Sequence, residues 1–431
     1  MSFIKTPIKG MPEHLPRDMA VREFVINRIK ENYGKYGFSL IETPAIEHIE
    51  NLSNREGGEN EMLIFRIMKR GEDLERAVET GDPAALCDCG LRYDLTVPLA
   101  RFFANNMNAL SLPFKALQVG SVWRADKPQK GRFRQFTQCD IDIIGDHSNL
   151  AEIELVSATA GMLHELGLGD FTVRINDRRI LKAMAAAAGF PEDRYGEVFV
   201  ILDKLDKTGV DGVRDMLAAG GFSAGSIDAY CGFFSGGGKE ARSSCSGYFA
   251  GRLDGVLPEG ILSGLDEIMR SAGKIMNGGD IVFDPSLVRG MSYYTGPIFE
   301  IALADTSALS LSVAGGGRYD EMIAKYTGSR TPVPACGISI GLERIITILK
   351  DRIDTNAGKD SAVYLIPPGA DSRRLEELFI KAKKMREEGK RVMISPKNKN
   401  MKNQIDRLLE LGYAEFIELA PEGEKTLNVK G

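Results

Sequence analysis

Hydrophobic and polar residues alternate most clearly between Phe114 and Gly145, where the pattern predicts two strands joined by a basic, polar loop. Along the second strand, Gln138, Asp140 and Asp142 share one face. The opposite face, suited to a core, carries Thr137, Cys139, Ile141 and Ile143. The polar face is therefore either a ligand site with one amide and two carboxylates or the solvated outer face of an edge hairpin.

The loop between these two strands is rich in cations, namely Arg124, Lys127, Lys130, Arg132 and Arg134. A hairpin with cations in its loop and carboxylates on its returning strand could hold a polyanion at one end and a cationic group at the other. The choice between a ligand-binding hairpin and a solvated edge hairpin depends on motifs elsewhere in the chain.

Apolar residues recur at helical spacing from about Pro16 to Gly34 and predict a helix. This helix passes into a strand over Phe38–Ile41 that stops at Pro44, and the pair serves either dimerisation or core packing. The polar segment 51–90, with several Glu and Gly residues, is expected to be a mobile insertion.

Further along the chain, a strand over Leu91–Thr96 is predicted to enter a helix over Val97–Asn105. A second helix is predicted from about Leu150 to Leu166. Helical patterns and a Gly/Ser-rich break dominate the segment of about 170–279, which is expected to be an inserted subdomain.

The last third of the chain contains two stretches of small residues. Three consecutive glycines in Ser312–Asp320 follow a predicted strand and would let a ligand lie against the backbone. Pro334–Arg344 is predicted to be a strand that passes into a helix, with small residues beneath Arg344 as a floor for a flat ligand. After a polar linker over 351–360, a β-α-β-α-β alternation predicts a small α/β domain over 361–431.

Length and composition describe an ordinary globular protein. A chain of 431 residues exceeds what one core usually supports, so two or three domains are expected. Hydrophobic residues make up 43% and charged residues 27% of the chain. The net charge of -5 argues against non-specific nucleic-acid binding through bulk charge, although it leaves room for a local basic surface.

Cysteine usage indicates a reducing compartment. The six cysteines have no framework spacing and are expected to be free thiols. Cys87 and Cys89 form a C-x-C pair, but none of the four histidines completes a ligand pattern, so no metal site made by the protein alone is expected. The chain has no apolar signal core and no run of apolar residues long enough for a membrane span, so a cytoplasmic location is expected.

Two further places carry candidate chemistry. Asp94 and Thr96 form an acid and hydroxyl pair, although Asp94 is equally explained as a helix cap. Arg289 stands beside a glycine, just ahead of Tyr293 and Tyr294, on a transition from loop to strand. An arginine there could neutralise a phosphate, and a tyrosine hydroxyl could bond a ring nitrogen. The alternative is a structural salt bridge with ordinary strand aromatics.

Taken in order, these motifs resemble the histidyl-tRNA synthetase family of class II aminoacyl-tRNA synthetases over nearly the whole chain. The resemblance is carried by Pro44, Asp94–Thr96, Arg124 through Gln138 to Asp142, Arg289–Gly296, Gly315–Asp320 and Gly341–Arg344. It implies an α+β fold with an antiparallel sheet flanked by helices. It also implies a catalytic domain over 1–350 with an insertion at about 170–279, a linker over 351–360 and an anticodon-binding α/β domain over 361–431.

The resemblance implies a role for each site residue. Arg124 and Arg344 would contact ATP, and Arg289 would be a catalytic arginine, together with Arg124, at the α-phosphate. Asp94, Thr96 and Gln138 would hold the α-amino group of histidine, while Asp142 and Tyr294 would bind the imidazole, with Tyr293 in the same histidine-binding set. Arg132 would face the acceptor end of tRNA(His).

The implied reaction is ATP-dependent activation of L-histidine and its transfer to tRNA(His), in a homodimer, with Mg²⁺ accompanying ATP. The alternative is a paralogous histidine-binding regulatory subunit of ATP phosphoribosyltransferase, which does not activate histidine. A histidine sensor has no use for three arginines around a triphosphate, and Arg124, Arg289 and Arg344 are all present, so the synthetase is favoured.

Three features depart from the family pattern. Ser292 stands where an aspartate is usual, and Asp142 stands where many bacterial members carry glutamate. The sequence ends at Gly431, where a further helix of the anticodon domain is expected. The first departure concerns the support of the arginine loop, and the last concerns tRNA affinity more than adenylate chemistry.

Overall fold

The computed structural model describes residues 3–53, 62–128, 132–234, 241–288, 293–303, 312–328, 330–353 and 360–428. These residues fall into two compact units. The larger lies within Met1–Pro12 and Ile26–Thr347, and the smaller lies within Glu13–Val25 and Ile348–Gly431.

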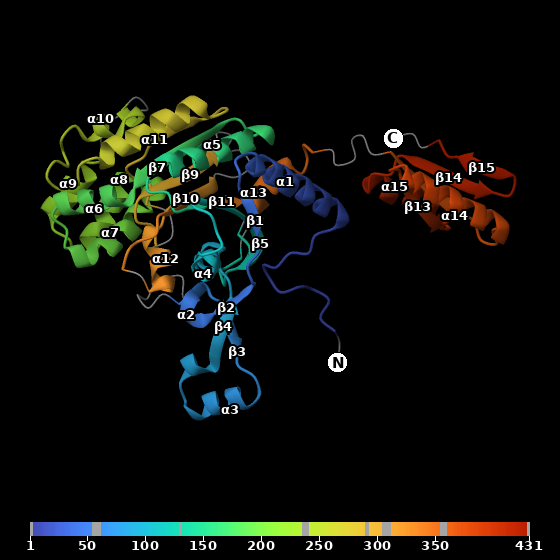
Figure 1. The fold of residues 1–431 in the computed structure, drawn as a ribbon, viewed down its shortest axis with the longest axis horizontal. Coiled ribbons are helices and arrows are strands. Elements are labelled where there is room, and N and C mark those ends of the chain that lie inside the picture. The colour runs from blue at the N-terminus through green and yellow to red at the C-terminus, as the bar shows by residue number, and fades with distance from the viewer. Residues whose placement is uncertain are drawn as a thin grey trace. The chain divides into compact units, whose positions relative to one another are not determined.

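The larger unit is built on an eight-stranded sheet in the order β1-β5-β6-β11-β10-β9-β7-β8 (Figure 1). The strands are β1 (Ser39–Ile41), β5 (Phe114–Trp123), β6 (Gln135–Ile144), β7 (Phe171–Asp177), β8 (Asp280–Phe283), β9 (Pro297–Leu303), β10 (Ser312–Arg318) and β11 (Ala335–Gly341). Neighbouring strands are antiparallel except for the two edge pairs, β1 with β5 and β7 with β8. The predicted antiparallel core and the β5–β6 hairpin are confirmed.

Helices cover this sheet. They include α1 (Pro16–Lys35), α4 (Thr96–Asn106), α5 (Leu150–Glu165), α12 (Asp320–Thr327) and α13 (Leu342–Leu349). Helix α5 is apolar on most sides and almost wholly buried, and it lies beside α11 (Ile261–Ile275) in Figure 1. One apolar cluster joins buried residues of α4 to Phe114, Ile144 and Tyr319. The elements that carry polar residues toward the site therefore rest on a packed core.

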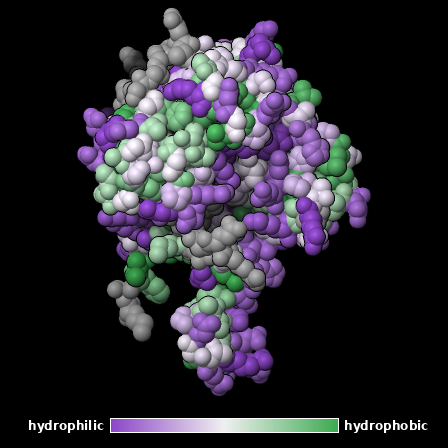
Figure 2. All heavy atoms as spheres, turned by 90° about the vertical axis from the view of Figure 1, so that its left-hand side faces the viewer, coloured by the Kyte–Doolittle hydropathy of each residue, from purple (hydrophilic) through white to green (hydrophobic). Residues whose placement is uncertain are grey.

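Helices fill the chain between β7 and β8, which both belong to the eight-stranded sheet. They are α6 (Arg178–Ala187), α7 (Tyr195–Leu202), α8 (Leu205–Ala219), α9 (Ala224–Cys231), α10 (Cys245–Phe249) and α11. Aromatic edge-to-face contacts, such as Phe190 on Phe222 and on Tyr230, hold this segment together. Figure 2 shows that hydrophilic side chains dominate this side of the molecule, with hydrophobic ones in small patches.

The segment 51–90, expected to be a mobile insertion, forms regular structure where it is described, together with the residues just before it. Strands β2 (Ile46–His48), β3 (Arg66–Met68) and β4 (Cys87–Leu91) make a sheet in the order β2-β4-β3. Helices α2 (Ile49–Leu52) and α3 (Gly71–Glu79) accompany them. A strand was expected over Leu91–Thr96, but the observed strand β4 ends at Leu91. Strands of three to five residues are too short to show an alternation in the sequence.

The smaller unit confirms the predicted β-α-β-α-β alternation. Its elements are β12 (Ser361–Ile366), α14 (Ser372–Glu387), β13 (Arg391–Pro396), α15 (Met401–Glu410), β14 (Glu415–Ala420) and β15 (Gly423–Thr426). The four strands follow the order β13-β12-β14-β15, and Tyr364 and Leu365 contribute to two different apolar clusters. Successive strand residues point to opposite faces, so both faces of this sheet are covered.

Two expectations about the whole chain can be compared with the structure. All six cysteines are free thiols, as predicted. No helix among the described residues has the length and apolar character needed to cross a membrane.

Candidate active site

A cleft of ≈ 670 Å³ opens over the sheet of the larger unit. It is lined by residues of β6, β10 and β11, by the starts of α4 and α13, and by Tyr293 and Tyr294 ahead of β9. The structure brings together nine of the ten site residues predicted from sequence, namely Asp94, Thr96, Arg124, Arg132, Gln138, Asp142, Tyr293, Tyr294 and Arg344. The tenth, Arg289, lies outside the described residues, as does Ser292.

The floor of the cleft is the polar face of β6. Gln138, Asp140 and Asp142 are buried there, as the alternation predicts. Strand β11 pairs with β6 so that Gly337 lies opposite Asp142. A Cβ atom at Gly337 would lie 1.9 Å from Oδ1 of Asp142, so this carboxylate occupies space that only glycine leaves free.

The three consecutive glycines serve packing between strands. They were expected to follow a strand, but they lie within β10. A Cβ atom at Gly316 would lie 1.9 Å from the carbonyl oxygen of Gly337. Because Gly316 and Gly337 sit on neighbouring strands, glycine at both positions lets β10 and β11 approach beneath the site.

Three acceptor atoms on the polar face have no hydrogen-bond partner among the described residues. They are Oε1 of Gln138, Oδ1 of Asp140 and Oδ2 of Asp142. Other atoms of two of these side chains are well bonded, since Nε2 of Gln138 donates to Oγ of Ser339 at 2.7 Å and the Tyr319 hydroxyl donates to Oδ1 of Asp142 at 2.6 Å. An unpaired buried acceptor is costly, so this face is suited to a ligand that supplies several N–H donors.

Burial raises the pKa of three carboxyl groups that line the cleft. The pKa of Asp142 is raised to about 7, although the hydrogen bond from Tyr319 opposes the shift. The pKa of Asp94 is raised to about 6, and that of Asp140 lies well above its usual range because burial adds to repulsion from Asp142. A cationic ligand would stabilise the ionised forms of all three.

Asp94 is both a helix cap and a residue of the cleft. Its Oδ1 accepts a hydrogen bond from the backbone N–H of Val97 at 3.1 Å, at the first turn of α4. Its Oδ2 lies 3.5 Å from the Tyr293 hydroxyl. Nε2 of Gln118 donates to the carbonyl of Leu95 at 3.1 Å and so holds this turn against β5. The two interpretations of Asp94 from sequence are therefore compatible.

Three tyrosines form one wall of the cleft. The rings of Tyr293 and Tyr294 meet at 5.0 Å, and those of Tyr293 and Tyr319 at 6.0 Å, both edge to face. Burial raises the pKa of all three phenols above the ordinary value, so they remain protonated donors at neutral pH. A planar ring between this wall and Asp142 would meet aromatic edges and a carboxylate together.

Three arginines line the same cleft, together with Lys207. Nε of Arg124 donates to the carbonyl of Tyr93 at 2.9 Å, and its guanidinium lies 5.2 Å from the ring centre of Phe136. Arg344 donates through Nη1 to the carbonyl of Ser312. Arg132 is 59% exposed, with Nε 3.6 Å from Oδ2 of Asp126. The hairpin thus combines cations with buried carboxylates in one cavity.

Two residues that shape this site were given no individual role from the sequence. Asp140 was placed on the polar face of the possible ligand site, but the family resemblance assigned it no contact, although its alternation with Asp142 was a sufficient signal. Tyr319 lay inside the glycine-rich stretch, and no sequence pattern indicates that it reaches Asp142 from far along the chain. Among the described residues, no group of three or more His, Cys, Asp or Glu side chains is arranged to hold a metal ion.

Comparison with known proteins finds relatives over nearly the whole chain. A sequence model of histidyl-tRNA synthetase matches residues 10–345. Histidine–tRNA ligase of Leifsonia xyli is 44% identical over 418 residues, which cover 95% of this chain and 94% of the relative. A probable histidine–tRNA ligase of Tropheryma whipplei is 38% identical over 424 residues, covering 96% of each chain.

Two solved structures share the fold. The crystal structure of histidyl-tRNA synthetase from Nostoc sp. PCC 7120 has a TM-score of 0.75 at 25% identity and covers 98% of this chain and 93% of that chain. An ATP phosphoribosyltransferase regulatory subunit/histidyl-tRNA synthetase from Bacillus halodurans C has a TM-score of 0.73 at 21% identity, covering 97% and 99%. At this identity the second likeness shows the fold alone.

Proposed function

The chain belongs to the histidyl-tRNA synthetase family, and from this premise we propose that its cleft is where L-histidine, ATP and the end of tRNA(His) meet. The protein is a histidine–tRNA ligase, which activates histidine and charges tRNA with it. One observation carries the proposed site. Three unpaired acceptor atoms on the buried face of β6 share a cavity with Arg124 and Arg344.

The α-amino group of histidine binds at Asp94, Thr96 and Gln138. An ammonium group supplies three N–H donors and one positive charge. Oε1 of Gln138 is an acceptor that lacks a donor, and Asp94 is a buried carboxyl whose ionised form a cation would stabilise. Asp140 adds a further unpaired acceptor on the same strand face, between Gln138 and Asp142.

The imidazole binds at Asp142 against Tyr293 and Tyr294. Tyr319 occupies one carboxylate oxygen of Asp142, and the other oxygen is left for an N–H of the ring. Amino acids without an N–H at this distance would leave a buried acceptor unpaired. Such a penalty is a strong form of discrimination.

Arg124 and Arg344 bind ATP, and Arg289 joins Arg124 at the α-phosphate. The histidine carboxylate attacks the α-phosphorus, which forms the mixed anhydride and releases pyrophosphate, so no side-chain nucleophile is required. Positioning of the two substrates and neutralisation of phosphate charge supply the catalysis. Mg²⁺ enters with the phosphates of ATP as part of the substrate.

The tRNA and dimer contacts complete the proposal. Arg132 is exposed at the rim of the cleft and is suited to the phosphates of the acceptor end. Residues 1–350 form the catalytic domain, and residues 361–431, after the linker 351–360, bind the anticodon in a cytoplasmic homodimer.

Two assays test this proposal. Exchange of labelled pyrophosphate into ATP that requires histidine reports the first step, and charging of tRNA(His) reports the second. Arg289→Ala is expected to lower kcat with little change in KM for histidine. Tight histidine binding by the wild-type chain without any exchange would instead favour the regulatory paralogue.

A further inference from the structure

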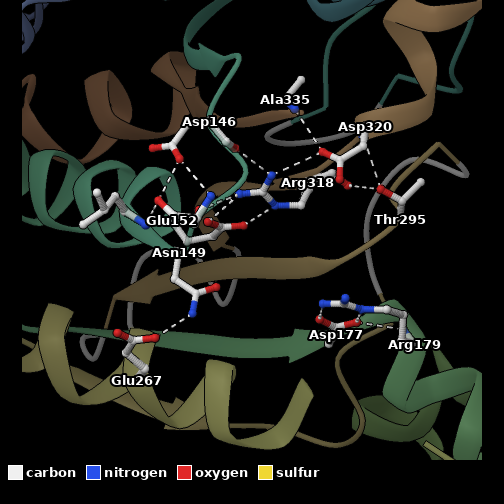
Figure 3. A network of polar contacts seen from close by, with 12 residues as sticks. Asp146, Asn149, Glu152, Asp177, Arg179, Glu267, Thr295, Arg318, Asp320 and Ala335 are labelled. Carbon is white, nitrogen blue, oxygen red and sulfur yellow. Dashed lines mark hydrogen bonds and ion pairs between the residues drawn. The ribbon is translucent and has the colours of Figure 1, made fainter. Parts of the chain in front are cut away.

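Arg318, the last residue of β10, is buried and does not line the cleft. All of its donors make hydrogen bonds, several of which are drawn in Figure 3. Nε and Nη2 bind the two oxygens of Glu152 at 2.5 and 2.8 Å. Nη1 donates to the carbonyl of Asp146 at 3.1 Å and to Oδ1 of Asp320 at 3.3 Å, and Nη2 donates to the carbonyl of Ser148 at 3.1 Å. Four N–H groups therefore join β10 to the loop after β6 and to α5, and the fifth binds Asp320 at the start of α12.

The backbone around Arg318 holds the segment that follows the paired tyrosines. Its carbonyl accepts from the backbone N–H of Thr295 at 2.8 Å. Oγ1 of Thr295 accepts from the N–H of Asp320 at 3.2 Å, and Oδ1 of Asp320 accepts from the N–H of Ala335 at 2.9 Å (Figure 3). Thr295, directly after Tyr294, and Ala335, at the start of β11, are thus both hydrogen-bonded to the segment Arg318–Asp320.

Tyr319 is the residue that connects this point to the cleft. Its side chain donates to Asp142, while the neighbouring Arg318 side chain turns to Glu152 of α5. Successive side chains of an extended chain point to opposite sides, so a fixed Arg318 also fixes the direction of Tyr319. Small displacements here would change the distance between the Tyr319 hydroxyl and Asp142.

Stability alone is a weak reason for such a pair. A buried ion pair often stabilises a fold no better than apolar residues of the same size, because desolvation offsets the attraction. A bidentate ion pair whose donors are all bonded instead fixes the relative positions of the segments that it connects. The segments held in this way are those that carry Tyr294, Tyr319 and Asp142.

We propose that Arg318 is a positioning residue for histidine recognition, which acts by holding Tyr319 and the segment after Tyr294 against Asp142. This inference rests on the proposed function of the cleft. Arg318 does not touch either substrate and acts only through the residues that bind histidine. Its loss should therefore weaken the binding of histidine and leave the binding of ATP unchanged.

Three variants of the full-length protein test this role. Arg318→Lys keeps the charge but cannot make the bidentate pair. Thr295→Val leaves the ion pair intact and removes the side-chain contact with Asp320. The matched control is Arg179→Ala, because Arg179 makes a similar pair, at 2.9 and 2.6 Å, with Asp177 two residues away, which joins no separate segments (Figure 3).

The readouts are KM for histidine and for ATP in pyrophosphate exchange, and the rise in melting temperature that histidine causes. Arg318→Lys is expected to raise KM for histidine on the order of tenfold, with KM for ATP and kcat within about twofold of wild type. The rise in melting temperature should shrink, since it depends on histidine affinity and not on chemistry. Thr295→Val should act in the same direction, and Arg179→Ala should resemble wild type.

A purely structural role gives a different result. If Arg318→Lys lowers the melting temperature but keeps the wild-type KM and the wild-type histidine effect, the inference is wrong. If Arg318→Lys does not fold, a wild-type KM for histidine in Thr295→Val overturns it. Absence of exchange in the wild-type protein would contradict the proposed function instead, while the histidine effect on melting would still report on Arg318.

Discussion

The hydroxyl of Tyr319 donates a hydrogen bond of 2.6 Å to Oδ1 of Asp142, and Oδ2 of the same carboxylate has no partner among the described residues. The two oxygens therefore differ in function. One fixes the orientation of the carboxylate, and the other remains available to a donor from a ligand. This asymmetry is the structural basis for reading a ring N–H at this position.

Replacing Asp142 with asparagine tests the available oxygen. Asp142→Asn keeps the shape but replaces one acceptor with an N–H₂ group, so KM for histidine should rise by roughly 10- to 100-fold, the loss of a charged hydrogen bond. Pyrophosphate exchange at varied histidine concentration measures it. The control is Asp170→Asn at an exposed carboxylate outside the cleft. An unchanged histidine requirement in Asp142→Asn would show that the imidazole binds elsewhere.

Adding one methyl group beneath Asp142 should have a similar effect without removing any polar atom. A Cβ atom in Gly337→Ala would lie 1.9 Å from Oδ1 of Asp142, so the carboxylate must move. We expect a large increase in KM for histidine together with a loss of stability of about 1–3 kcal/mol from overpacking. Gly225→Ala is the control, because nothing lies within 4 Å of its new Cβ. Equal behaviour of the two variants in exchange and thermal melting would contradict the close packing.

The raised pKa values predict how stability depends on pH in the absence of ligand. Burial raises the pKa of Asp142 to about 7 and that of Asp94 to about 6, so both bind a proton more tightly in the folded chain than in the unfolded chain. Their contribution is therefore complete in acid, below the unfolded pKa, and is lost as the pH rises through the folded pKa values.

Asp142→Asn cannot titrate at this position, so its stability relative to wild type should increase as the pH rises from about 5 to about 8. Thermal melting of both proteins without ligand, over this range, measures the difference. A difference that stays constant with pH would mean that the Asp142 carboxyl ionises normally in the folded protein.

Loss of an arginine proposed to bind ATP should change different kinetic constants from loss of a residue proposed to bind histidine. Arg344→Ala is expected to raise KM for ATP by about tenfold or more, since a charge-assisted contact to phosphate is lost, while KM for histidine changes little. Exchange at varied ATP measures this effect. Arg373→Ala, at an exposed arginine of α14 in the smaller unit, serves as the control. If KM for histidine rises and KM for ATP does not, Arg344 contacts histidine and not ATP, and the prediction is wrong.

Local pattern predicted the parts of this site that lie on one continuous strand. The period of two in β6 placed Gln138, Asp140 and Asp142 on one face, and the small residues of β11 indicated a floor. The alternation is visible because one face is packed on the core and the other is polar. The resemblance to a family then connected this hairpin with distant motifs.

What the sequence did not predict depends on contacts between distant segments. Tyr319 meets Asp142, and Arg318 meets Glu152, across more than a hundred residues of chain. No local periodicity indicates either contact, because each depends on where β10 lies in the sheet. The short strands β2, β3 and β4 were missed for a related reason, because they are defined by their pairing in one sheet, which no local pattern shows.

A crystal structure of the protein with bound L-histidine would show how the cleft holds this amino acid. We expect an imidazole nitrogen about 2.7–3.2 Å from Oδ2 of Asp142 and the α-amino group within the same range of Oε1 of Gln138. We also expect the Tyr319 hydroxyl to stay on Oδ1. Histidine bound with its ring away from β6, and Oδ2 of Asp142 still without a donor, would contradict the proposed histidine site.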